Sequence, residues 1–146
     1  MSSRVQILKG VYWAGLVVVF ALFLWAGLQK AIHLDAFCLS VYRYHLFPEV
    51  VVNWVAFWVV GLELICAFFL FIPLFRLAVL WVLFFMLLFF TVGIGVNLVR
   101  NVQMGCGCFS SSPMADDLSV FGIVKNVGLI VLLFFLIVQE VRSKKG

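Results

Sequence analysis

Two cysteines separated by a single glycine are the most chemically suggestive feature of the chain. They lie in the stretch Gly105-Cys106-Gly107-Cys108-Phe109-Ser110, between two strongly apolar runs. A Cys-X-Cys pair can close a disulfide only as a small, strained ring, and strained exposed disulfides exchange readily with other thiols. Gly107 removes the side chain that would obstruct so tight a backbone. The spacing predicts thiol–disulfide chemistry at Cys106 and Cys108, with two free or structurally bonded cysteines as the alternative.

The other two cysteines have less distinctive surroundings. Cys38 is expected on the same side of the membrane as the pair, where it could resolve a mixed disulfide, but packing beneath an amphipathic helix explains it equally well. Cys66 falls inside an apolar run and is expected only to pack. A zinc site that combined the pair with His33 and His45 would take its ligands from two separate loops, so no metal is expected.

The composition requires that lipid, rather than water, surrounds most of the chain. Of the 146 residues, 66% are hydrophobic and only 11% are charged, which is more apolar side chain than a soluble domain of this size can bury. The net charge of +4 does not indicate nucleic-acid binding, because the basic residues sit at the ends of apolar runs. We expect one all-α domain, a bundle of four transmembrane helices. The predicted spans are residues 10–29, 50–72, 77–99 and 119–139.

Sequence features at the ends of these runs support this division. The first run is longer than the apolar core of a signal peptide, which has roughly 7–15 residues, so it is expected to be an uncleaved helix that ends at Lys30. Residues 31–48 are too polar to span, but their apolar residues recur at roughly helical spacing. This pattern predicts a short amphipathic helix on the membrane surface, ended by Pro48. Gly93 and Gly95 in the third span are expected to permit close helix approach.

The distribution of basic residues predicts the orientation. Four spans place both termini on one side of the membrane. That side is expected to hold six basic residues and the other side three, namely Arg4, Lys9, Arg76, Arg142, Lys144 and Lys145 against Lys30, Arg43 and Arg100. The positive-inside rule then places both termini in the cytoplasm of a bacterial cell and the loop with the cysteine pair in the periplasm, where disulfides persist.

Glu63 is the second chemical signal, because it lies near the middle of the second span. An ionised carboxylate at the bilayer centre costs about 2.5–3.5 kcal/mol on insertion scales, so its side chain should face the bundle interior and be paired or protonated. Lys125 is the only other ionisable group expected well inside a span, and Asn126 or a water could bridge the two. The pair would serve a proton relay or the polar end of a quinone-like ligand, or it would only fix the helix register.

Further polar residues are expected at the outer ends of the first, third and fourth spans. Snorkelling to the membrane interface accounts for Lys30 and Arg100. Asn97, Lys125 and Asn126 could instead line a pocket beneath the thiol loop. The predicted cofactor-binding set is Lys30, Glu63, Asn97, Arg100, Lys125 and Asn126, with a quinone as the candidate ligand.

The order of several short motifs along nearly the whole chain resembles a known family. The motifs are Gly27-Leu28-X-Lys30 at the end of the first span, a loop that bears Phe37 and runs to Pro48, Glu63-Leu64 in the second span, Cys106-Gly107-Cys108-Phe109 after the third, and Lys125-Asn126 in the fourth. This order is similar to that of the MauE/DoxX-like superfamily of small four-helix membrane proteins, and the Cys-X-Cys-Phe motif favours the MauE branch. The chain departs from the family at Ser110, where Gly is frequent, and at Lys125, where Arg is more usual. Lys keeps the charge but loses the bidentate geometry.

The resemblance implies a role in maturing disulfide-containing periplasmic enzymes beside a thioredoxin-like partner, and DoxX-like relatives imply sulfur and quinone redox chemistry. We therefore expect an inner-membrane protein whose Cys106 and Cys108 exchange electrons with a periplasmic thioredoxin-like protein and pass them to or from a quinone or Cys38. Lys30 or Arg100 would lower the pKa of the attacking thiol. Two alternatives belong to other classes: an accessory subunit of a larger membrane complex without its own chemistry, and a small proton-coupled transporter that uses Glu63.

Overall fold

The computed structural model describes residues 2–43, 47–99 and 118–146 of the chain. Its helices are α1 (Ser2–Ile32), α2 (Leu34–Arg43), α3 (Glu49–Phe69), α4 (Arg76–Val99) and α5 (Leu118–Lys145). These described ranges contain helices and no strands, so the prediction of an all-α fold is confirmed.

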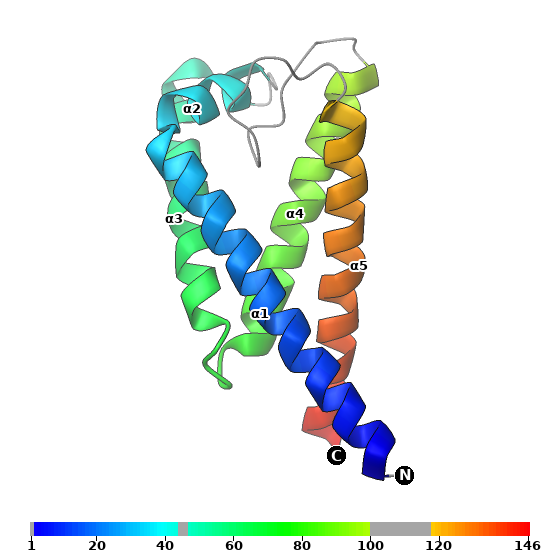
Figure 1. Ribbon diagram of the computed structural model, residues 1–146. Coiled ribbons are helices and arrows are strands. Elements are labelled where there is room, and N and C mark those ends of the chain that lie inside the picture. The colour runs from blue at the N-terminus through cyan, green and yellow to red at the C-terminus, as the bar shows by residue number, and fades with distance from the viewer. Residues whose placement is uncertain (1, 44–46, 100–117) are drawn as a thin grey trace.

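Four of the described helices, α1, α3, α4 and α5, are long and apolar enough to cross a membrane. Helix α1 crosses the bundle obliquely, and both termini lie at one end of it (Figure 1). The short helix α2 lies at the opposite end, where α4 finishes and α5 begins (Figure 1). We call the end with both termini the terminal end and the end with α2 the α2 end.

The sequence around α2 explains why the chain turns there. His33 separates α1 from α2, yet the backbone hydrogen bonds continue across it, from His33 N to Gln29 O and from Phe37 N to His33 O, each at 3.0 Å. Phe37 and Val41 lie one helical turn apart and are buried against α3 and α4, whereas Asp35 is exposed. The predicted amphipathic segment between the first two spans is thus confirmed.

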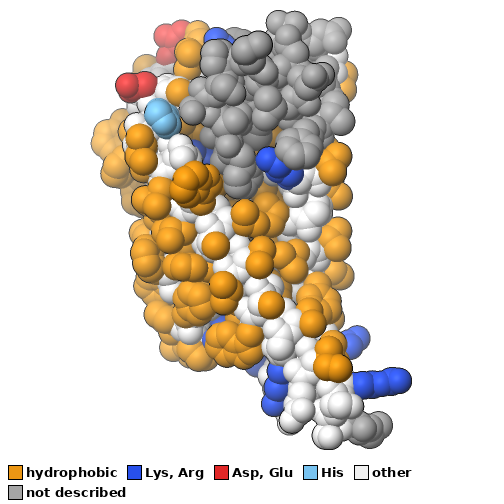
Figure 2. Space-filling model, viewed as in Figure 1, with side chains coloured by type: hydrophobic (Ala, Val, Ile, Leu, Met, Phe, Trp, Pro, Cys, Tyr) orange, Lys and Arg blue, Asp and Glu red, His pale blue; other side chains and the backbone are white. Residues whose placement is uncertain are grey.

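The exterior of the bundle is as apolar as its core. Leucines from α4 and α5, with Leu16 and Val19 of α1, fill the main core and are almost completely buried. Large side chains also face outward, among them Trp54 and Trp58 on α3, which are 67% and 70% exposed. Figure 2 shows hydrophobic side chains over the middle of the visible face, with Lys and Arg side chains at the terminal end and others near the α2 end. Such a surface suits lipid and not water.

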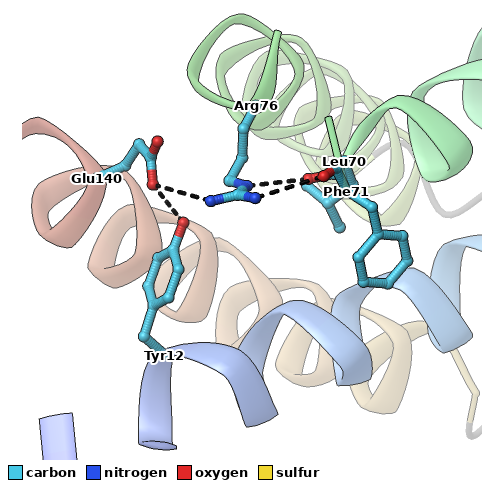
Figure 3. Close-up of polar contacts among 5 residues, drawn as sticks. All are labelled: Tyr12, Leu70, Phe71, Arg76 and Glu140. Carbon is cyan, nitrogen blue, oxygen red and sulfur yellow. Dashed lines mark hydrogen bonds and ion pairs between the residues drawn. The ribbon is translucent and has the colours of Figure 1, made fainter. Parts of the chain in front are cut away.

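A buried polar cluster ties three helices together near the terminal end (Figure 3). The guanidinium of Arg76 donates from Nε to the carbonyl oxygen of Leu70 at 3.1 Å and lies 3.7 Å from Glu140 Oε2, measured from Nη1. The hydroxyl of Tyr12 donates to the same Glu140 oxygen. Arg76 therefore satisfies a carbonyl that the end of α3 leaves free and also joins α4 to α5. The sequence had suggested only that Arg76 is one of the basic residues that determine the orientation of the protein in the membrane.

Close approach between α1 and α3 depends on Gly27. A Cβ atom at this position would lie 2.8 Å from Leu64 Cδ2, inside van der Waals contact. The expectation that Gly95 permits close approach is wrong for the described residues, because none of them would lie within 4 Å of a Cβ there. Gly93 is buried, and its expected role in close helix approach stays a prediction.

The contact at Gly27 leads to a prediction for stability. The substitution Gly27→Val should lower the free energy of unfolding by about 1–3 kcal/mol, because the added carbons overpack the space held by Leu64. Gly128→Val is the matched control, since a Cβ at Gly128 meets nothing within 4 Å. Thermal unfolding of the purified protein in mild detergent measures both. Equal melting temperatures for the two variants would contradict this packing.

Candidate functional site

An ion pair between α1 and α3 is the most deeply buried polar contact among the described residues. Lys30 Nζ lies 2.7 Å from Glu63 Oε2, and the two side chains are only 3% and 2% exposed. Bulk water does not reach either charge there, so the opposite charges compensate one another. The open position at Gly27 allows the two helices to come close enough for this contact, because it lies one turn before Lys30 on α1.

Two aromatic rings surround the ammonium group of Lys30. Its Nζ lies 5.5 Å from the ring centre of Phe37 on α2 and 5.3 Å from that of Phe90 on α4. The negative faces of such rings attract a cation, and the attraction is stronger where water is excluded. Together with Glu63, the rings bring α1, α2, α3 and α4 to one charged group.

The fifth helix contributes Asn126 to the same place. Asn126 is 1% exposed, and its Nδ2 atom has no hydrogen-bond partner within the described ranges. It lines a small pocket of about 20 Å³ with Lys30, Glu63, Met86 and Phe90. That volume is enough for about one water molecule, and the polar groups around it are suitable partners for one. We call Lys30, Glu63, Asn126 and this pocket the polar centre.

The polar centre differs in two respects from what the sequence predicted. The prediction that Lys30 snorkels to the interface is wrong, because its side chain is buried and paired. Glu63 pairs with Lys30 rather than with Lys125, which is half-buried and does not line the small pocket. Asn126 lines the same small pocket as Glu63. The other predicted members of the set cannot be placed: the side chain of Asn97 and all of Arg100 lie outside the described part of the structure.

Cys38 lines an open cleft of about 740 Å³ between α2 and α3. Acidic side chains, Asp35 and Glu49, lie along the same cleft, and Glu49 accepts a hydrogen bond of 2.6 Å from the Tyr42 hydroxyl. Partial burial, and then the charge of Asp35, raises the pKa of the Cys38 thiol. Its surroundings therefore favour the protonated thiol and do not activate it as a nucleophile.

The remaining cysteines divide between the core and the segment that is not described. Cys66 is 5% exposed and packs in the main core, as expected. Cys106 and Cys108 lie outside the described residues, as does His45 of the zinc alternative. Within the ranges that are described, no three His, Cys, Asp or Glu side chains come together as metal ligands would.

Comparison with known proteins places the chain in a family. The family model described as methylamine utilisation protein MauE matches residues 8–139. The chain belongs to the MauE family. The resemblance drawn from the order of the motifs is thereby confirmed. No curated protein and no solved structure matches the chain.

The match to the MauE family covers both regions in which chemistry was predicted. Residues 8–139 include all the groups of the polar centre and the Cys106-Gly107-Cys108 segment. Membership of this family, together with four apolar helices long enough to span, identifies a multi-pass membrane protein. The buried charges of this MauE-family member therefore lie in a bundle that is surrounded by lipid.

The polar centre predicts an asymmetric response to substitution. Lys30→Met should lower the free energy of unfolding by about 3–5 kcal/mol, because it leaves the Glu63 carboxylate buried without a partner. The double variant Lys30→Met/Glu63→Met should recover more than half of that loss. Lys9→Met, the same change at an exposed position of α1, is the control. The expected order of melting temperatures in detergent is control, double variant, single variant; a single variant as stable as the control would rule out the pair as a stabilising contact.

Proposed function

We propose that this MauE-family protein is an inner-membrane thiol–disulfide redox protein that works with a periplasmic thioredoxin-like partner in maturing periplasmic proteins. One observation carries the proposal. The segment that contains Cys106 and Cys108 joins the last residue of α4, Val99, to the first residue of α5, Leu118, and both helix ends lie at the α2 end with Cys38 (Figure 1). Cys38 and the two helix ends that this segment joins therefore lie at the same end of the bundle.

The charge distribution supports a periplasmic location for the α2 end. The exposed basic residues at the terminal end are Arg4, Lys9, Arg142, Lys144 and Lys145. At the α2 end, Arg43 is exposed, Lys125 is half-buried, and Lys30 is enclosed in the polar centre. By the positive-inside rule this asymmetry favours a cytoplasmic terminal end. The cysteines at the other end would then face an oxidising compartment.

The proposed exchange follows ordinary thiol chemistry. A thiolate of the Cys106–Cys108 pair attacks one sulfur of the partner's disulfide, so that a mixed disulfide forms as the partner's bond breaks. The second thiol of the pair then displaces the partner, which leaves with both sulfurs reduced while Cys106 and Cys108 become a disulfide. The reverse sequence oxidises the partner. Because its surroundings favour the protonated thiol, Cys38 is not assigned the initial attack.

The polar centre has a positioning role in this proposal. Lys30 of α1 pairs with Glu63 of α3 and contacts the ring of Phe37, which holds α2 against these two helices. Lys30 also contacts the ring of Phe90 on α4, the helix that precedes the thiol segment in the chain. The cleft beside Cys38 is lined by the same α2 helix together with α3. A partner that approached the cysteines would meet this cleft, whose exposed side chains include Asp35 and Glu49.

The proposal predicts that a covalent intermediate can be trapped in cells. Removal of the resolving thiol by Cys108→Ser or Cys106→Ser should allow a mixed disulfide with a thioredoxin-like protein to accumulate in one of the two variants. Acid quenching, alkylation and a non-reducing gel with mass spectrometry would show it. Cys66→Ser, a change in the core, should leave the wild-type pattern, and the Cys106→Ser/Cys108→Ser double variant should yield no complex.

The same experiment separates the alternative functions. Thiols that never change state in cells, with every cysteine variant fully active, would contradict the redox proposal. Recovery of the protein only within a larger assembly in mild detergent would then favour an accessory subunit. Loss of transport in Glu63→Gln, with both loop cysteines dispensable, would favour a proton-coupled transporter.

A further inference from the structure

We propose that this protein binds a quinone with an isoprenoid or alkyl chain, taken from the lipid, with the chain in a groove between α3 and α4 and a ring carbonyl at Asn126. A quinone would supply the thiol chemistry proposed above with a two-electron carrier. In that role the proposal rests on the redox function, but binding itself can occur and be measured without any thiol.

The groove has the size and lining of a site for a hydrocarbon chain. It has a volume of about 780 Å³ and is partly open on the surface of the bundle. Its walls include Val55 and Val59 of α3 and Trp81, Phe85 and Phe89 of α4, and all the side chains that line it are apolar. Ligand sites in proteins have volumes of roughly 300–1,000 Å³ and are mostly apolar. In a bilayer this groove opens toward lipid chains, so an apolar ligand can reach it without crossing water.

The packing of the helices explains why the groove exists. The turn between Phe69 and Arg76 is short, but α3 packs chiefly on α1 and α4 chiefly on α5. The polar centre holds α3 to α1, and the cluster at Arg76 holds the start of α4 to α5. The facing surfaces of α3 and α4 pack less closely than these two pairs of helices. The groove lies between these two surfaces.

The groove adjoins the polar centre. Met86 and Phe90 line both the groove and the small pocket that contains Lys30, Glu63 and Asn126. The small pocket holds only about 20 Å³, so a ring enters it only when these two side chains move aside. Methionine is suited to this, because its unbranched side chain has several accessible rotamers of similar energy. Met86 and Phe90 are thus the partition between the chain site and the polar centre.

The polar groups on the far side of the partition select the ligand's head. Asn126 Nδ2 is a buried donor without an acceptor among the described residues. A hydrogen bond to a ligand acceptor would remove the free-energy cost of this unsatisfied donor. The charges of Lys30 and Glu63 already compensate one another, so a charged phospholipid headgroup would disturb the pair. A quinone is neutral, carries carbonyl acceptors, and has an apolar chain. In the function proposed above, a dithiol and a quinone would give a disulfide and a quinol, with two electrons and two protons transferred.

Titration of the full-length protein with decylubiquinone in phosphatidylcholine nanodiscs tests the proposal. Trp81 lines the groove, so a saturable component of fluorescence quenching is expected, and Trp81→Phe should remove it. Val55→Phe/Val59→Phe should weaken binding more than about tenfold by filling the groove. Val127→Phe/Val131→Phe is the matched control, since both positions are exposed on α5 and lie one helical turn apart. Asn126→Leu should weaken binding by about three- to tenfold through loss of one hydrogen bond.

The possible outcomes are distinct. Quenching that never saturates, or groove and control variants with equal affinity, would show that ordinary lipid fills the groove and would overturn the proposal. Weak binding in the groove variant with unchanged affinity in both Asn126→Leu and Asn126→Ala would overturn the placement of the carbonyl. Melting temperatures identify any variant that fails to fold. The Cys106→Ser/Cys108→Ser variant should bind decylubiquinone like the wild type, so its failure to trap a partner concerns the redox function alone.

Discussion

The contact on which the structure most depends is the ion pair between Lys30 and Glu63. In water such a pair would contribute little, but here both charges are buried in a bundle surrounded by lipid, where loss of either partner is costly. The pair therefore requires α1 and α3 to stay together, and the absence of a side chain at Gly27 allows it. The rings of Phe37 and Phe90 extend this requirement to α2 and α4. One buried charge thus determines how four helices meet at the α2 end.

The bundle has a second polar connection, close to its terminal end. Arg76 contacts Glu140 and the carbonyl group of Leu70, and Glu140 also accepts a hydrogen bond from Tyr12 (Figure 3). Between these two clusters lies the main core of buried apolar side chains. Such an arrangement holds α1 to α3 and α4 to α5 while the facing surfaces of α3 and α4 remain partly apart. The shape of the lipid-facing groove and the position of the charged pairs are therefore two aspects of the same packing.

The sequence was sufficient for the fold but not for the partners of its polar residues. Lengths of apolar runs predict spanning helices, and the spacing of Phe37 and Val41 predicts α2. The cost of a charge in lipid predicts that Glu63 faces inward. The choice of Lys30 over Lys125 depends on the tilt and rotation of whole helices, which no local pattern encodes. Glu140 was overlooked because α5 continues to Lys145, beyond the predicted end of the span at residue 139.

The central claim is that Glu63 stays ionised in the membrane because Lys30 compensates its charge. An infrared difference spectrum between the wild type and Glu63→Gln, recorded in lipid bilayers at neutral pH, tests it most directly. The account predicts that the substitution removes an ionised carboxylate band and no protonated carboxyl band. Loss of a protonated carboxyl band instead would show that Glu63 is neutral, and the organisation of the bundle around a buried ion pair would be contradicted.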